Sequence, residues 1–361
     1  MRIGRSRGAA RWKPRFRVEE TGGVRALLVK NPSSVFRIAD VHPRDKVYRD
    51  QSLSYGSEYH VPVMVSEVLG YLNPARGGFY LDGTLGGGGH SEAILDASGS
   101  AFVIGVDRDP AALAEASRRL MGFGGRFRAV QGNYANAVQA SELEPGSLAG
   151  VLLDLGISSR QVDEDARGFT FRSGAPLDMR MEGAAGFESA ADLLNTMDEA
   201  ELATIFWRYG EEKKSRRLAR VIVEMREKQP LERSDDLSSA VDRVIPRATS
   251  QDRARIFQAV RIAVNDEITS LELALPSLRD ALAAGGVFVV IAYHSLEDRL
   301  VKDSFREWSR ECVCPPGLPV CVCRGAALGE SLTRKPVMAS PDEVELNPRA
   351  RSARLRAWRK T

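Results

Sequence analysis

The chain has 361 residues, enough for one large or two ordinary domains, and its 43% hydrophobic and 27% charged residues are typical of a globular protein. It contains no run of 18 apolar residues and no apolar segment near residue 1, which argues against a transmembrane helix and a secretory signal. The net charge is only +3, but residues 2–18 and 348–361 carry basic and no acidic side chains. Such ends are compatible with a phosphate-rich partner or with solvated tails.

Residues 1–55 match no pattern of strands or helices, and we expect a basic N-terminal extension that can be disordered. From residue 78 onward, short apolar segments alternate with helical patterns. Asp109 and Pro110 supply the N-cap and the first-turn proline of a helix that runs to Leu120. The expected strands cover residues 79–81, 101–106, 127–130 and 151–155. This alternation predicts βαβ units and a parallel sheet.

The alternation stops at about residue 163, and the signals are then mostly helical. One apolar stripe at helical spacing ends before Pro230, and a second runs from Phe257 to Leu271 after a cap at Thr249 or Ser250. Residues 286–292 resume the strand pattern. We therefore predict one α/β domain, residues 56–162 and 265–361, interrupted by a helical insertion at residues 163–264.

Four consecutive glycines, residues 86–89, lie between the first strand and a helix that begins near His90. The dinucleotide pattern G-x-G-x-x-G lacks its third glycine here, because Ser91 occupies that position. No P-loop lysine follows. Asp107 ends the second strand 21 residues after Gly86, where it suits a ribose. S-adenosylmethionine fits these features, and another nucleotide remains an alternative.

Further motifs follow in order along the chain. They are HVPV (60–63), DGTLGGGGHS (82–91), DRDP (107–110), DLGISSRQ (154–161), RGF (167–169), PLDMRM (176–181), YGEE (209–212), FQAVRI (257–262), HSLEDR (294–299) and NPRAR (347–351). Over residues 58–358 this series closely resembles the bacterial 16S ribosomal RNA cytosine-N4-methyltransferases, the RsmH or MraW family.

The resemblance implies a Rossmann-like class I methyltransferase sheet with an inserted helical domain, and S-adenosylmethionine as the cofactor. It implies direct in-line methyl transfer to the N4 amine of a decoding-centre (P-site) cytidine in 16S rRNA, within the small ribosomal subunit. The cofactor contacts that carry over are Gly88, Gly89, His90, Asp107, Tyr134, Asp154 and Gln161.

The cytosine N4 amine is a weak nucleophile, and a hydrogen-bond acceptor would help to remove its proton. Asp154, which ends the fourth strand, is the first candidate, although a structural or adenine contact is nearly as plausible; Asp178 and His294 are weaker candidates. The unpaired base would stack on an aromatic ring such as Phe169 or Phe171.

Several polar residues have both a functional and a structural interpretation. Arg261 and Asn265 lie four apart on one helix face, where they can contact RNA or each other. At His90 the backbone N–H at the helix start can matter more than the imidazole. Two basic runs can contact phosphates or can be solvated: Lys213, Lys214, Arg216, Arg217 and Arg220, and Arg349, Arg351, Arg354 and Arg356. The second run can instead form a strand that closes the sheet.

The four cysteines, Cys312, Cys314, Cys321 and Cys323, have the spacing C-x-C-x6-C-x-C. Without a disulfide scaffold elsewhere, they indicate a reducing cytoplasm. Reduced loop thiols are the first interpretation, because C-x-C side chains on an extended segment diverge; a zinc site and a redox pair are the alternatives.

For the whole chain, a nicotinamide-dependent oxidoreductase and a non-catalytic RNA-binding assembly factor are the competing functions. The sequence does not indicate the oligomeric state.

Overall fold

The computed structural model describes residues 62–183, 188–314, 320 and 322–361, all within one compact unit, Pro43–Thr361. The extension predicted for residues 1–55 lies outside the described residues.

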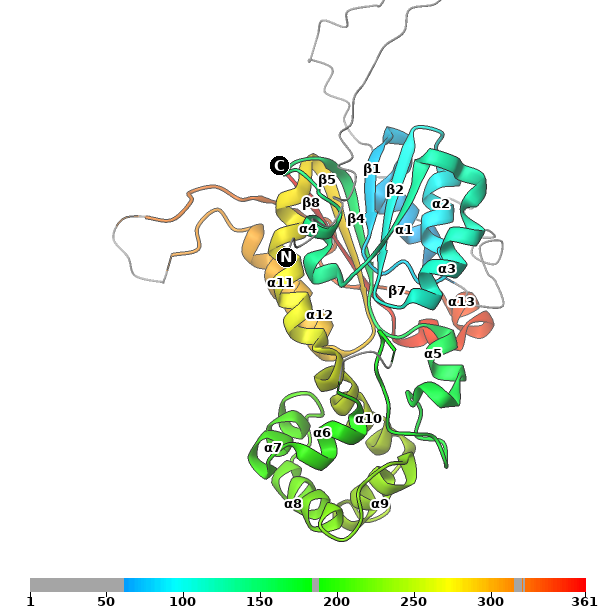
Figure 1. Cartoon of the computed structure of the whole chain (residues 1–361). Coiled ribbons are helices and arrows are strands. Elements are labelled where there is room, and N and C mark those ends of the chain that lie inside the picture. Colours follow the sequence, from blue (N-terminus) through cyan, green and yellow to red (C-terminus); the bar gives the residue numbers. More distant parts are fainter. Residues whose placement is uncertain (1–61, 184–187, 315–319, 321) are drawn as a thin grey trace, which may run out of the picture. The chain divides into compact units, whose positions relative to one another are not determined.

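One sheet forms the centre of the fold, with the strand order β3–β2–β1–β4–β5–β8–β6 and with β7 paired to β8 (Figure 1). The first five strands are parallel, and β8 is antiparallel to β5, β6 and β7. The strands are β1 Gly78–Asp82, β2 Ala101–Asp107, β3 Phe127–Gln131, β4 Leu148–Asp154, β5 Leu282–Ala292, β6 Gly329–Ser331, β7 Val337–Met338 and β8 Arg354–Lys360. This topology confirms the predicted α/β class and the Rossmann-like sheet.

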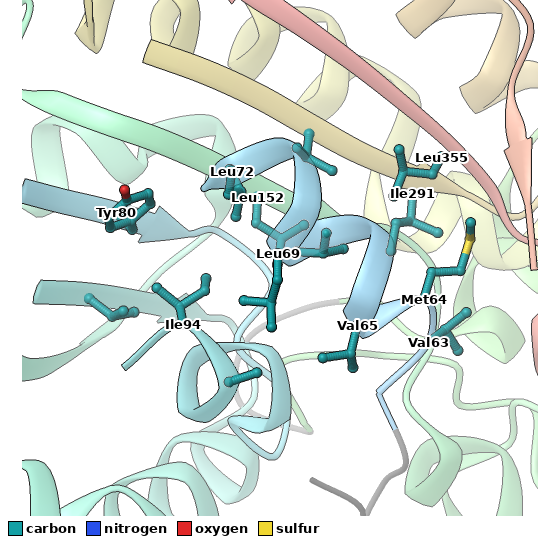
Figure 2. Packing of buried hydrophobic residues seen from close by; sticks show 14 of the residues in the cluster. Val63, Met64, Val65, Leu69, Leu72, Tyr80, Ile94, Leu152, Ile291 and Leu355 are labelled. Atoms are coloured by element: carbon teal, nitrogen blue, oxygen red, sulfur yellow. The ribbon is translucent and has the colours of Figure 1, made fainter. Parts of the chain in front are cut away.

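Side chains that alternate along the strands build a separate core on each face of the sheet. On β4, Leu152 packs into one core, whereas Val151 and Leu153 pack into the other. Figure 2 shows the first core, in which Leu152 lies beside Leu69 and Leu72 of the first helix and Ile291 lies beside Leu355. Both faces of a parallel sheet must be covered by helices, which explains the continuous apolar character of β4 and β5.

The helices that cover the sheet come from both ends of the described chain. The first core includes residues of α1 Val65–Leu72, α2 Gly89–Ala97 and α3 Pro110–Arg119, and the second includes residues of α4 Ala137–Ala140, α11 Glu267–Ala281 and α12 Ser295–Trp308. Asp109 caps α3 as predicted, because its side chain accepts a hydrogen bond from the Ala111 backbone N–H at 2.9 Å. The short helices α5 Ser159–Asp163 and α13 Pro341–Leu346 complete this part of the chain.

Between β4 and β5 the chain forms a group of helices with a hydrophobic core of their own. They are α6 Ala190–Thr196, α7 Glu199–Arg208, α8 Ser215–Arg226, α9 Ser234–Val244 and α10 Ser250–Asn265. Phe206 and Leu218 are fully buried among them. The apolar stripes of this region therefore fill a core separate from the two cores of the sheet.

The apolar stripe from Phe257 to Leu271 belongs to more than one helix. The structure has two helices, α10 and α11, separated by Asp266 in the left-handed conformation (φ 48°, ψ 43°). The apolar spacing continues through the break, so the spacing alone could not reveal it. In the described part of the chain, no helix is long and apolar enough to cross a membrane.

Candidate active site

A cavity lies at the carboxyl ends of the parallel strands. Asp107 is the last residue of β2 and Asp154 the last of β4, while Gly83 follows β1 and Tyr293 follows β5, and all four line the cavity. Ligands of open α/β sheets bind at this edge, because the helices and loops that follow the strands diverge there. The cavity is therefore the candidate active site.

The glycine run borders the cavity at some positions only. Gly86 lines it with φ +50°, and the nearest atom to a Cβ added there would be the Thr84 carbonyl oxygen at 3.9 Å. Gly89 also lines the cavity, although a Cβ at this position would meet Pro62 at 2.8 Å. Gly86 thus presents bare backbone to the cavity.

Gly88 was expected to contact the cofactor, but it is not among the residues that line the cavity. Its φ is +81°, and a Cβ would lie 3.2 Å from both Ala116 and Leu120, at the end of α3. The absent side chain at Gly88 is therefore explained by backbone conformation and by packing against α3.

Asp107 connects the end of β2 to the glycine bend. Its two carboxylate oxygens accept hydrogen bonds from the backbone N–H groups of Gly86 at 2.8 Å and Asp109 at 2.9 Å. Burial raises the pKa of Asp107, and these two bonds oppose the rise. Each oxygen retains a further lone pair, so the carboxylate can also accept hydrogen bonds from a ribose.

Tyr134 and Gln161 line other parts of the same cavity. The Tyr134 hydroxyl donates to the Glu267 carbonyl oxygen at 3.2 Å, which fixes the ring. The Gln161 side chain accepts from the Ser158 N–H at 3.0 Å and donates to Asp109 at 3.4 Å. The structure thus gathers Gly89, His90, Asp107, Tyr134, Asp154 and Gln161 around one cavity.

Asp154 is a cavity carboxylate whose contacts and burial shift its pKa. Its Oδ1 accepts a hydrogen bond from the Tyr293 hydroxyl at 2.8 Å, and its Oδ2 lies 3.7 Å from His90 Nδ1. Its side chain is 10% exposed, and this burial raises its pKa to about 7 against the lowering effect of the Tyr293 bond. A carboxylate with such a pKa exchanges a proton readily at neutral pH.

The His90 imidazole takes part in the same arrangement. Its Nε2 donates to the Val63 carbonyl oxygen at 2.8 Å, which directs Nδ1 toward Asp154. Burial lowers the pKa of His90, so the neutral ring is favoured. The His90 side chain therefore has a defined structural role. The sequence had suggested that its backbone N–H can matter more than the imidazole.

Tyr293 and Glu297 are cavity residues that the sequence analysis did not select. Glu297 accepts a hydrogen bond from the Tyr293 N–H at 2.9 Å and lies beside His294 at 3.2 Å. The sequence did hold a signal for Tyr293, because the first residue after a parallel strand faces the carboxyl edge of the sheet.

Two candidate proton acceptors lie outside the cavity lining. His294 is the N-cap of α12, where its side chain accepts from the Glu297 N–H. The Asp178 carboxylate pairs with Arg180 at 2.6 Å; burial raises the pKa of Asp178, but the bonds from Arg180 lower it overall. A carboxylate held ionised by an arginine is a poor proton acceptor.

The candidate RNA contacts Arg261 and Asn265 are inside the protein. Both oxygens of Glu267 bind the Arg261 guanidinium, at 2.8 and 2.9 Å. Asn265 is 3% exposed, donates to the Met179 carbonyl oxygen at 2.7 Å and accepts from the Met181 N–H at 2.9 Å. Asn265 also donates to the Arg261 carbonyl oxygen at 2.9 Å, so the structure shows the contact between the two residues, which was the alternative to an RNA contact.

The candidate stacking residues lie near the helical core and not along the cavity. Phe169 is half-buried against that core, whereas Phe171 is exposed and contacts the ring of Phe257 edge-on at 6.0 Å.

Arg354 and Arg356 belong to β8 and pair with Asp298, so they are not part of a loose basic tail. The alternative of a closing strand is thus confirmed for this run.

A family model and the curated relatives of this chain give a single family. Residues 57–361 match the model described as the MraW methylase family. A protein of Gemmatimonas aurantiaca named ribosomal RNA small subunit methyltransferase H is 54% identical and covers 83% of this chain and 95% of its own length. The same name belongs to a Geotalea uraniireducens protein that is 49% identical over 84% of this chain and 98% of its own.

Among solved structures, an rRNA methylase from Streptococcus thermophilus is similar with a TM-score of 0.38. It is 10% identical and covers 83% of this chain and 98% of its own length.

Proposed function

The chain belongs to the MraW methylase family, and from this premise we propose that it methylates small-subunit ribosomal RNA at the N4 amine of a decoding-centre cytidine. It is a methyltransferase with S-adenosylmethionine as its cofactor. The proposal extends the family assignment to one nucleotide and one atom. Because the substrate belongs to the ribosome, we infer that the protein acts in the cytoplasm.

One observation carries the proposal: a single cavity joins a bare glycine bend and the Asp107 carboxylate to Asp154, whose pKa is about 7. The cavity residues fit the cofactor. Gly86 leaves backbone accessible to a charged aminoacyl group, Asp107 can accept hydrogen bonds from a ribose, and Tyr134 offers a ring beside a base. The cofactor supplies a methyl group that is already electrophilic on its sulfonium.

The remaining chemistry belongs to side chains of this protein. Ionised Asp154 accepts a hydrogen bond from the substrate amine, which localises the nitrogen lone pair, and then takes the proton. Tyr293 fixes the orientation of Asp154 through its 2.8 Å bond, and His90 approaches the second carboxylate oxygen. Holding the amine and the methyl group about 3–3.5 Å apart and in line would supply most of the remaining rate enhancement.

We propose further that residues 56–162 and 265–361 hold the cofactor and that residues 163–264 recognise the substrate. Support comes from the separate hydrophobic core of α6–α10 and from the cavity residues, most of which precede residue 162 or follow residue 265. Met181 is an exception that brings the inserted segment to the cavity.

The test compares Asp154→Asn with the wild type, using small ribosomal subunits that lack the methyl group. We expect N4-methylcytidine formation, measured by mass spectrometry of nucleosides, to fall about 100-fold or more, as for loss of a general base. Cofactor affinity, measured by calorimetry, should stay within about threefold. Asp96→Asn, an exposed carboxylate on α2 outside the cavity lining, is the matched control and should retain its rate.

The outcomes separate the competing functions. A methyl group on another atom or nucleotide would contradict the N4 assignment, and an Asp154→Asn variant of normal rate would remove the proposed proton acceptor. Wild-type protein that binds the RNA and the cofactor without turnover would favour a binding-only assembly factor.

A further inference from the structure

The segment between α12 and β6 contains three described cysteines. Cys312 and Cys314 follow the end of α12, and Cys323 comes from the part of the segment that returns toward β6. Figure 1 shows the described parts of this segment, in orange, extending away from the sheet. The three Sγ atoms nevertheless converge and lie within 4.8 Å of one another. We propose that Cys312, Cys314 and Cys323 bind a zinc ion that fixes this segment.

The spacing of the sulfur atoms agrees with tetrahedral coordination. Zinc–sulfur bonds of about 2.3 Å at tetrahedral angles set sulfur–sulfur distances at about 3.8 Å. The Sγ atoms of Cys312 and Cys323 lie 3.8 Å apart. A disulfide between these two cysteines would need about 2.05 Å, so they are not an oxidised pair. The Cys323 thiol donates a hydrogen bond to the Cys312 sulfur at this distance, and a zinc ion in place of that proton can keep the two sulfurs at the same spacing.

On an extended segment the side chains of a C-x-C pair diverge, which disfavours a zinc site. In the structure, Cys312 and Cys314 are not in a strand, and both sulfurs face the same point as that of Cys323. Alternation of side chains holds only for a regular strand, so this objection does not apply here.

The backbone and a neighbouring arginine stabilise the same arrangement. The Val313 N–H donates to the Cys323 Sγ at 3.4 Å, a contact that favours negative charge on that sulfur. Arg324, the next residue, donates to the Glu307 carboxylate at 2.7 Å and to the Arg310 carbonyl oxygen at 3.1 Å. Cys323 is thereby held against the end of α12, where the Cys312 arm begins.

Two described valines of this segment add no hydrophobic packing to it. Val320 is 70% exposed and Val322 78% exposed, so neither side chain contributes to a core. Short segments without a core commonly depend on a metal or a cross-link. Soft thiolate ligands favour zinc over harder cations, and the thiols lose their protons when the ion binds.

The test uses the full chain purified under reducing conditions. We expect about one zinc per chain by elemental analysis, and cobalt(II) exchanged into the protein should give thiolate charge-transfer bands and the visible bands of a tetrahedral ion. Cys312→Ser and Cys323→Ser should each lower metal affinity at least about tenfold. Val322→Ser, an exposed position in the same segment, is the matched control and should keep the metal.

A second readout addresses the structural role. Removing zinc with a chelator should increase amide hydrogen exchange in residues 309–328, while cofactor binding measured by calorimetry shows that the rest of the protein remains folded. A wild-type protein without stoichiometric zinc and without cobalt–thiolate bands would overturn the proposal. So would zinc retained in both cysteine variants, or iron with acid-labile sulfide in place of zinc.

Discussion

At the residue scale, the Tyr293 hydroxyl and the Asp154 carboxylate form the contact on which the proposed chemistry depends most directly. The bond between them is 2.8 Å long and both side chains line the cavity. The tyrosine stabilises the ionised carboxylate, whereas burial disfavours it. The two effects together leave Asp154 able to gain and lose a proton near neutral pH.

Tyr293→Phe removes the hydroxyl and keeps the ring. Asp154 must be ionised to accept a proton, so activity should fall as the pH drops through its pKa of about 7. Losing a bond that lowers this pKa should move the acid limb of the kcat/KM profile to higher pH by about one unit. Tyr80→Phe, which removes a hydroxyl that donates to the Gly77 carbonyl oxygen, is the control. An unchanged profile for Tyr293→Phe would contradict the positioning role.

Two glycines of the same run should respond differently to alanine. At Gly88 the left-handed backbone and the contacts with Ala116 and Leu120 should cost about 2–3 kcal/mol of unfolding free energy. At Gly86 the backbone cost should be about 1 kcal/mol, and the new methyl group should chiefly weaken cofactor binding. Urea unfolding and calorimetry separate the two effects. Equal losses of affinity at both positions would refute this distinction.

Sequence reasoning found most cavity residues but selected the wrong neighbour after β5. His294 was named as a weaker candidate for the proton acceptor, and the structure makes it the N-cap of α12. The spacing of Arg261 and Asn265 predicted a contact with RNA or with each other, because the spacing is the same for an exposed and a buried face. Whether a polar side chain meets solvent or Glu267 depends on tertiary packing, and one sequence does not contain that information directly.

At the element scale, the break between α10 and α11 has a large effect on the site. Asp266 interrupts the helix with one left-handed residue, and Arg261 before it and Glu267 after it form an ion pair, with Glu267 on the cavity. The strands and the caps of α3 and α10 were predictable because each has a local signal. The break has none, since aspartate is only mildly favoured in the left-handed region.

Substitution of Asp266 tests the strain at this break. The side chain is exposed and makes no cap hydrogen bond, so a change there reports mainly on the backbone. Asp266→Gly should leave stability unchanged or raise it by up to about 1 kcal/mol, whereas Asp266→Val should lower it by about 1–2 kcal/mol. Denaturant unfolding of both variants provides the measurement. A valine variant as stable as the glycine variant would mean that the two helices can join without cost.

At the scale of the whole molecule, the described residues form three separate hydrophobic cores. Two cover the faces of the sheet and the third lies among α6–α10. On α8, Arg216 and Arg217 are exposed, next to the buried Leu218 and Ala219 that face the third core. This helix therefore offers basic side chains to solvent from a firmly packed support.

If α8 contacts rRNA phosphates, removing both arginines should weaken RNA binding at all sequences alike. For Arg216→Ala/Arg217→Ala, the slope of log affinity against log salt should fall in magnitude by about 1–2, because each lost phosphate contact releases fewer counterions. Filter binding across salt concentrations measures the slope, and cofactor affinity should not change. An unaltered slope would assign these arginines to the solvated surface.

The place of β8 in the sheet has a consequence for how the protein is made. Of the described strands it comes last along the chain, yet it lies between β5 and β6 and pairs with both. While the ribosome is still adding the residues before Arg354, the apolar β5 has a neighbour on one edge only. Open edges of this kind recruit strands from other chains. The interval between the synthesis of β5 and that of β8 is therefore when nascent copies are most prone to aggregate and most in need of chaperone protection.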